Sequence, residues 1–176
     1  FSIYSFYAFI SGGKKGFKLF WKNILPPTVA SVSTCSSAAS IPVNITSAKN
    51  IGVSDDIAET MIPLGTSFHK DGSVIGSVFK IMFLVYLFQT NTSLSTIIIT
   101  SILATLLITA VPIGGGTISE MFILQILGFP SSALPIILII ATIIDAPATV
   151  LNVVGDSCSS LIVARIIDGK DFQTKT

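Results

Sequence analysis

The chain has 176 residues, of which 51% are hydrophobic and only 11% are charged. Soluble domains carry about 25% charged residues, so this composition, with a mean hydropathy of +0.84, argues against a soluble globular protein and excludes a disordered one. The formal net charge of +1 gives no reason to expect a nucleic-acid partner. Cys35 and Cys158 lie in no metal-ligand or redox spacing, and we expect both to be small buried residues. We therefore expect an all-α, polytopic membrane protein fragment whose solvent is the lipid bilayer.

The chain opens in an apolar stretch, Phe1–Ile10, that precedes its first basic residues. A signal peptide has the opposite order, so we expect this stretch to be the end of a transmembrane helix whose start is missing. The chain is then expected to be the C-terminal part of a larger protein. Basic residues cluster at Lys14, Lys15, Lys18 and Lys22, and again at Arg165, Lys170 and Lys175. The positive-inside rule places both clusters in the cytoplasm.

Two Ser/Gly/Pro-rich tips, at 33–42 and 112–117, each lie between apolar arms. Because non-helical backbone at membrane depth must be buried in protein or line a wet cavity, each tip predicts a re-entrant helical hairpin. Paired discontinuous helices are also the best sequence pointer to the binding site of a secondary transporter. We expect, in chain order, the end of a transmembrane helix and a cytoplasmic loop (1–15), hairpin one (16–52), a broken transmembrane helix (53–92), hairpin two (93–130), a last transmembrane helix (131–167) and a cytoplasmic tail (168–176).

The last apolar stretch, expected to be helical from 133 to about 167, carries a polar stripe. Asp145, Thr149, Asn152 and Asp156 recur at spacings that place them on one helix face. Two carboxylates, an amide and a hydroxyl suit a cation or an amine, and a ligand carboxylate can meet Asn152 and Thr149. The alternative is a helix whose polar groups bond only to neighbouring helices, although two buried acids need partners there too.

A second polar segment, HKDG at 69–72, lies between two apolar helices. Its glycine can break the turn, and unwound backbone would present carbonyl oxygens and Asp71 to a cation. Lys70 is either an internal cation that neutralises a neighbouring carboxylate or a residue that snorkels to an interface. His69 either carries protons or packs with a hydrogen bond.

Two further ionisable residues receive no functional role from the sequence. Lys80, in a helix expected from Ser73 to about Gln89, is expected to snorkel or to face a neighbouring helix. Glu120 is expected near the mouth of hairpin two.

Four segments carry a family resemblance: SSAASIPV (36–43), IPLGTSFHKDGS (62–73), VPIGGG (111–116) and DAPATVLNVVGD (145–156). In this order they resemble the dicarboxylate/amino acid:cation symporters, the glutamate-transporter-like family of sodium-coupled carriers. The resemblance covers nearly the whole chain. It implies a multi-pass protein of the plasma (inner) membrane, expected to be bacterial, whose missing part supplies a trimerising scaffold. This chain would be most of a transport domain that moves across the membrane like an elevator, in a homotrimer.

The resemblance also assigns the site residues. A small-molecule substrate would contact Ser36, Ser37, Gly114, Gly115, Asp145, Thr149 and Asn152. A coupled cation would contact Gly65, His69, Asp71, Asn152 and Asp156, with sodium at Asp71, Asn152 and Asp156. No enzymatic activity and no cofactor are expected beyond the coupled cation, which is sodium, with a proton as the alternative.

The departures from the family pattern set the expected substrate. The family sequence N-M-D-G-T reads H-K-D-G-S here, which puts the usual sodium count in question. In acidic amino-acid carriers an arginine holds the second carboxylate of the substrate bidentately. The three places where the family carries that arginine hold Ala148, Cys35 and Ala146 in this chain. Because a buried carboxylate without a countercharge is costly, we expect a small neutral amino acid.

Three alternatives stay open on the sequence. Dicarboxylate or acidic amino-acid symport would follow if Lys70 reaches the substrate. An ion- or proton-conducting channel subunit would use Asp145 and Asp156 with His69, although paired hairpin tips count against it. An intramembrane hydrolase would need Ser73 beside His69 and Asp71, which are too close in sequence to supply a triad and an oxyanion hole.

Overall fold

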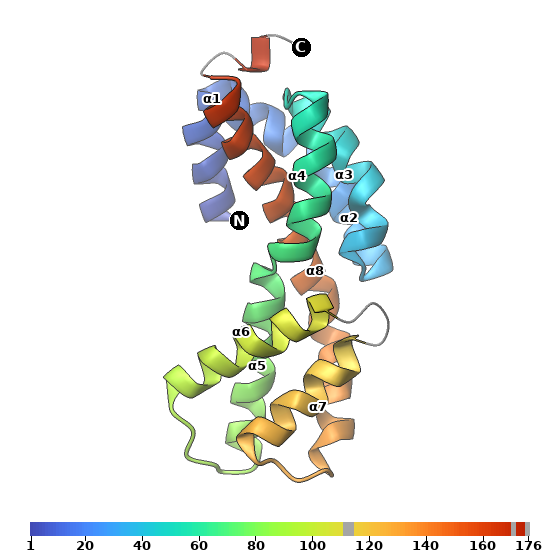
Figure 1. Cartoon of the computed structure of the whole chain (residues 1–176), viewed down its shortest axis with the longest axis vertical. Helices are drawn as coiled ribbons and strands as arrows, with labels where there is room; N and C mark the ends of the chain where they lie inside the picture. Colours follow the sequence, from blue (N-terminus) through green and yellow to red (C-terminus); the bar gives the residue numbers. More distant parts are fainter. Residues whose placement is uncertain (111–114, 170–171, 175–176) are drawn as a thin grey trace. The chain divides into compact units, whose positions relative to one another are not determined.

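A computed structural model describes residues 1–110, 115–169 and 172–174. Within these residues the regular structure is α-helical apart from one 3-10 helix, η1, at Phe172–Thr174. The described residues contain no strand, which confirms the expected all-α class. The chain divides into two compact units, Phe1–His69 with Thr149–Thr176, and Lys70–Ala148 (Figure 1).

The first unit contains α1 (Ser2–Asn23), α2 (Leu25–Thr34), α3 (Ser37–Ile51), α4 (Asp55–Phe68) and the second half of α8 (Ala133–Ile167). Helix α1 is kinked at Gly13, whose φ of 60° and ψ of −152° are open to glycine and costly for other residues. Helices α2 and α3 lie side by side and are joined by a tight turn (Figure 1). They occupy the segment predicted to form the tip and arms of hairpin one.

The core of the first unit is a cluster of apolar side chains drawn mainly from α1, α3, α4 and α8. Its fully buried members include Phe20, Ile51, Ile62, Val154 and Leu161. Where the unit lies in lipid, such side chains stabilise it through close van der Waals packing and not through removal from water. They also fix which face of α8 is turned inward, because Val154 and Leu161 lie two helical turns apart on one side.

The second unit contains α5 (Asp71–Leu87), α6 (Leu94–Ala110), α7 (Gly115–Leu127) and the first part of α8. Helix α6 packs against both α5 and α7. The buried side chains include Ile81 and Leu84 of α5, Ile123 of α7 and Ile137 of α8. Of the tip predicted for hairpin two at 112–117, residues 112–114, which include Gly114, lie outside the described residues, and Gly115 is the first residue of α7.

Large apolar side chains also cover the outer surface. Phe79 is 61% exposed, Ile139 65% and Ile143 71%. One helix of the described residues, α8, is long and apolar enough to cross a membrane by length and composition, while Leu94–Ile108 and Gly116–Leu127 are shorter apolar helices. Helix α8 begins at Ala133 and ends at Ile167, which is where the sequence placed it.

Two expectations from the sequence are corrected by the structure. Cys158 is buried as predicted, but Cys35 is exposed, because it forms the turn between α2 and α3 with a left-handed φ of 47°. The break in the helix predicted at 69–72 is shorter than expected. His69 and Lys70 have non-helical backbone, whereas Asp71 and Gly72 already belong to the first turn of α5.

Candidate functional site

The first unit is organised around the carboxylate of Asp156, which is fully buried on α8. The Thr66 hydroxyl donates a hydrogen bond to Asp156 Oδ2 over 3.2 Å. His69 Nδ1 lies 3.5 Å from Asp156 Oδ1. Thr66 and His69 are three residues apart, so the end of α4 presents one face to this acid. A carboxylate and a hydroxyl supply oxygen atoms of the kind that a small hard cation prefers.

Two glycines let α4 and α8 approach this closely. A Cβ added to Gly65 would lie 2.6 Å from Asp156 Oδ1, and a Cβ added to Gly155 would lie 2.1 Å from His69 Cε1. Both distances are far below a van der Waals contact, so any larger residue must displace the acid or the imidazole. The absence of a side chain at these two positions therefore allows the close contact of Asp156 with α4.

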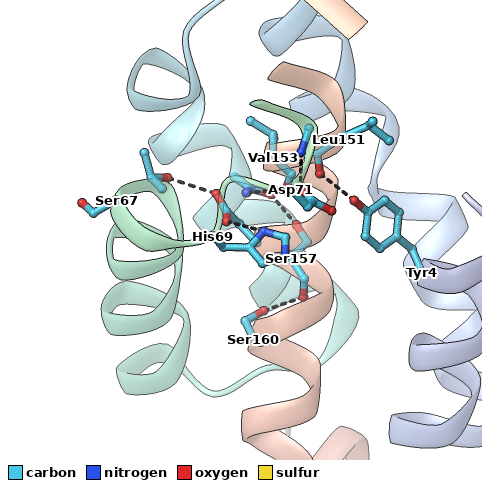
Figure 2. A network of polar contacts seen from close by, with 12 residues as sticks. Tyr4, Ser67, His69, Asp71, Leu151, Val153, Ser157 and Ser160 are labelled. Carbon is cyan, nitrogen blue, oxygen red and sulfur yellow. Dashed lines mark hydrogen bonds and ion pairs between the residues drawn. The ribbon is translucent and has the colours of Figure 1, made fainter. Parts of the chain in front are cut away.

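A hydrogen-bonded scaffold fixes α8 within the first unit. Asn44 of α3 donates to the Val153 carbonyl over 3.0 Å and accepts a hydrogen bond from the Ser157 hydroxyl. The Tyr4 hydroxyl donates to the Leu151 carbonyl over 3.1 Å, and Figure 2 shows the ring pointing at that carbonyl. Because Asn44 and Ser157 are buried, these bonds are made away from water and orient the residues between them.

The tip of hairpin one is an N-terminal helix cap. The Ser36 hydroxyl accepts a hydrogen bond from the Ala39 amide over 3.2 Å, and Ser37 is the first residue of α3. The Thr34 hydroxyl accepts one from the Ser36 amide over 3.2 Å. The first amides of a helix lack intrahelical acceptors and attract anions, so this end of α3 suits a ligand carboxylate.

Thr149 and Asn152 lie on the part of α8 that belongs to the first unit, and both are buried. Among the residues predicted to bind the cation, the structure brings Gly65, His69 and Asp156 into contact with one another. Thr66 was missed by the sequence analysis. Its position beside Gly65 and three residues before His69 was the available signal, since helical spacing puts it on the same face as the imidazole.

The second unit holds three further residues that the sequence analysis singled out, Lys70, Asp71 and Asp145. Asp71 Oδ1 accepts a hydrogen bond from the Gly72 amide over 2.8 Å, in the first turn of α5. Lys70 immediately precedes that turn. Asp145 lies on the exposed side of α8, four residues before the boundary between the units.

The same unit contains an ion pair between Lys80 of α5 and Glu120 of α7. The side chains are only 7% and 3% exposed, and the Lys80 ammonium donates to Glu120 Oε1. The sequence analysis gave neither residue a functional role. Of the two expectations for Lys80, snorkelling is wrong and facing a neighbouring helix is confirmed, because the ammonium lies inside the unit and pairs with a residue of α7. Asp145 interacts electrostatically with both residues. A buried pair of this kind is costly to break, by about 3–5 kcal/mol when one partner is removed.

An all-α fold with apolar outer faces and buried ionisable groups is characteristic of membrane proteins that carry polar solutes. Residues 1–166 match the sodium:dicarboxylate symporter family. The chain belongs to that family, whose members are membrane-embedded transporters.

Named relatives agree with this membership. The chain is 30% identical over 154 residues to the human neutral amino acid transporter A, which covers 84% of this chain and 28% of the relative. It is 25% identical over 164 residues to the human neutral amino acid transporter B(0), covering 91% and 30%. It is also 25% identical over 154 residues to glt-6 of Caenorhabditis elegans, a candidate sodium-dependent excitatory amino acid transporter, covering 85% and 28%.

The chain thus spans less than a third of the length of these relatives. All three relatives are animal proteins and give no support to the expected bacterial source.

Proposed function

We propose that this chain carries the substrate- and cation-binding part of a sodium-coupled symporter for a small neutral amino acid. The observation that carries the proposal is the fully buried Asp156 carboxylate, held by a hydroxyl and an imidazole at the end of α4. Oxygen ligands of this type suit a small hard cation. Membership of a sodium:dicarboxylate symporter family and two relatives named for neutral amino acids support it.

The cation site proposed in the first unit uses Asp156 and Asn152 of α8, Gly65 of α4, and the backbone of His69, the residue that follows α4. The side chains supply a carboxylate and an amide, and Gly65 supplies backbone. In the second unit Asp71, at the start of α5, is proposed to bind a further sodium ion. His69 replaces the family's asparagine, so a proton is the alternative coupled cation, and the imidazole is the group that would carry it.

The substrate is proposed to be recognised at its two ionic ends. In the first unit Ser36 and Ser37, at the start of α3, receive the carboxylate, with Thr149 and Asn152 as further polar contacts. In the second unit Asp145 receives the amine, and Gly114 and Gly115 at the second tip contact the substrate. The side chain of the substrate meets no arginine at 35, 146 or 148, so a second carboxylate would have no fixed bidentate partner there.

Coupling follows if substrate and cation each stabilise the same closed state of the second hairpin. Each then raises the affinity of the other by the same factor, as linkage requires. The movement proposed for the intact protein is an elevator-like displacement of the transport domain in a homotrimer, as the family resemblance implies.

Uptake by the intact protein in proteoliposomes tests the proposal. Labelled serine, alanine, aspartate and succinate are each offered with and without an inward sodium gradient. We expect sodium-driven uptake of serine or alanine and none of aspartate or succinate. Uptake of aspartate or succinate would contradict the neutral substrate and favour Lys70 as the carboxylate partner. Uptake driven by a proton gradient and indifferent to sodium would contradict sodium coupling.

A gain-of-function variant sharpens the test. Ala148→Arg places a guanidinium where acidic carriers of the family hold one, so aspartate uptake should appear while serine uptake falls. Ala148→Gln is the matched control, because it adds a long polar side chain without the charge. Equal aspartate uptake by the two variants would show that charge at this position does not select the substrate.

A further inference from the structure

Three ionisable side chains of the second unit act on one another although they come from three helices. The Lys80 ammonium of α5 donates to Glu120 of α7, and both side chains are buried. Asp145 of α8 interacts electrostatically with both members of the pair. The group therefore contains one positive and two negative charges, and one of the negative charges belongs to the residue to which we assign the substrate amine.

The packing of the helices keeps this group together. Lys80 is followed by Ile81 and Leu84 on the buried face of α5, and Glu120 is followed by Ile123 and Leu124 on the buried face of α7. These apolar side chains pack in one cluster, so the lysine and the glutamate are held at its edge. A buried ammonium must have a countercharge, and the hydrogen bond shows that Lys80 takes it from Glu120.

Removing the charge of Glu120 changes the balance of the group. Lys80 would then be a buried cation without its partner, and its flexible four-carbon stem lets the ammonium move to another carboxylate. Asp145 already attracts it electrostatically. An ammonium bound to Asp145 occupies the same carboxylate oxygens that a substrate amine needs.

We propose that Glu120 is a positioning residue for substrate selectivity, because it engages Lys80 and so prevents this internal ammonium from competing with the substrate amine at Asp145. The inference rests on the proposed role of Asp145 and names a specificity determinant outside the polar stripe. It makes a distinctive prediction: Glu120 is needed only while Lys80 is present.

The test measures binding of labelled serine to the intact protein in detergent with sodium. Glu120→Gln should raise the Kd for serine by about tenfold or more, since it frees a buried charge. The double variant Lys80→Met with Glu120→Gln should recover the Kd to within about threefold of the unmodified protein. Glu120→Asp is the matched control, because it keeps the charge, and its Kd should also stay within about threefold.

The outcomes separate this inference from the proposed function. If the unmodified protein does not bind serine, or if Asp145→Asn binds it equally well, the proposed role of Asp145 is wrong. Both the proposed function and the inference on Glu120 are then contradicted. If Asp145→Asn abolishes binding but Glu120→Gln binds as tightly as the unmodified protein, this inference alone is wrong. A double variant as weak as Glu120→Gln also contradicts it, because a purely structural role of Glu120 would not be rescued by removing Lys80.

If the Glu120→Gln variant does not fold, the single variant Lys80→Met tests the proposal instead. Without its ammonium no competitor for Asp145 exists, so serine should bind with an unchanged or lower Kd. A Kd raised by tenfold or more would overturn the proposal, since Lys80 would then be attracting the substrate itself.

Discussion

The two units each contain a buried acid, and the acids differ in what holds them. In the first unit Asp156 accepts a hydrogen bond from the Thr66 hydroxyl and lies beside the His69 imidazole. In the second unit Glu120 is paired with the ammonium of Lys80. A carboxylate beside a hydroxyl offers oxygen atoms of the kind that a small hard cation prefers, whereas the ammonium of Lys80 gives Glu120 a countercharge within the unit. The comparison predicts that Asp156 matters chiefly for transport and the Lys80–Glu120 pair chiefly for stability and selectivity.

Replacing the acid of the first unit should have the largest effect. Asp156→Asn keeps the size of the side chain and an acceptor for Thr66 but removes the charge. We expect sodium-driven serine uptake to fall by at least about 100-fold, because the proposed cation ligand is lost, while the protein still folds. Asp168→Asn is the control, since Asp168 also accepts a hydrogen bond from a hydroxyl, that of Ser54. Comparable losses in both variants would show that the effect is not specific to Asp156.

Breaking the ion pair of the second unit should instead cost stability. Glu120→Ala leaves the Lys80 ammonium buried and unpaired, and we expect the free energy of unfolding to fall by about 3–5 kcal/mol. Thermal unfolding in detergent measures this, and Glu59→Gln is the control. Glu59 also pairs with a lysine, Lys49, but the pair is at the surface, so little change is expected. Equal shifts in unfolding temperature would contradict the importance of burial.

The contact between α4 and α8 can be loosened without changing any charge. Gly155→Ala places a Cβ where the His69 ring lies, so we expect a loss of about 1–3 kcal/mol in stability through overpacking, with weaker dependence of uptake on sodium. Gly116→Ala is matched to it, because a Cβ there meets nothing within 4 Å. A normal sodium dependence in Gly155→Ala would mean that the position of His69 does not matter for the cation.

The helix cap at the tip of hairpin one should give the smallest effect. Ser36→Ala removes the acceptor of the Ala39 amide, and loss of such a cap costs about 1 kcal/mol. Ser33→Ala is the control, since the Ser33 hydroxyl bonds only back to the Val29 carbonyl of its own helix. If the cap also prepares α3 for a carboxylate, Ser36→Ala should raise the KM for serine and Ser33→Ala should not.

Much of the helical framework could be predicted because it depends on local sequence. The bounds of α8 follow from a largely apolar stretch, interrupted only on one helix face by the polar stripe, between a proline-containing loop and a polar end. The polar stripe follows from helical periodicity alone. The non-helical backbone at His69 and Lys70 was also indicated, but the residue at which α5 begins was not. Asp71 accepts a hydrogen bond from the amide of Gly72, and an acid in the first turn favours the start of a helix.

The contacts between helices could not be predicted from one sequence. Lys80 and Glu120 are 40 residues apart, and their pairing depends on the packing of α5 against the second hairpin. Asn44 and Ser157 are 113 residues apart. No spacing or motif in the sequence predicts either pair, because contacts between residues of different helices depend on how the helices pack and not on periodicity within one helix. Cys35 was expected to be buried because cysteines outside metal and redox motifs usually are, and the sequence did not show that it forms the exposed turn between α2 and α3.

The polar stripe has a consequence for how α8 enters the membrane during synthesis. The helix has 35 residues, and Asn152 and Asp156 lie in its second half, after the strongly apolar first turns. On insertion scales a single aspartate at the centre of a helix costs about 2.5–3.5 kcal/mol. The second half of α8 is therefore poorly suited to partition into lipid alone. We expect it to insert together with α3 and α4. Asn44 of α3 then replaces the hydrogen bond of Ser157 to water, and Thr66 of α4 replaces that of Asp156.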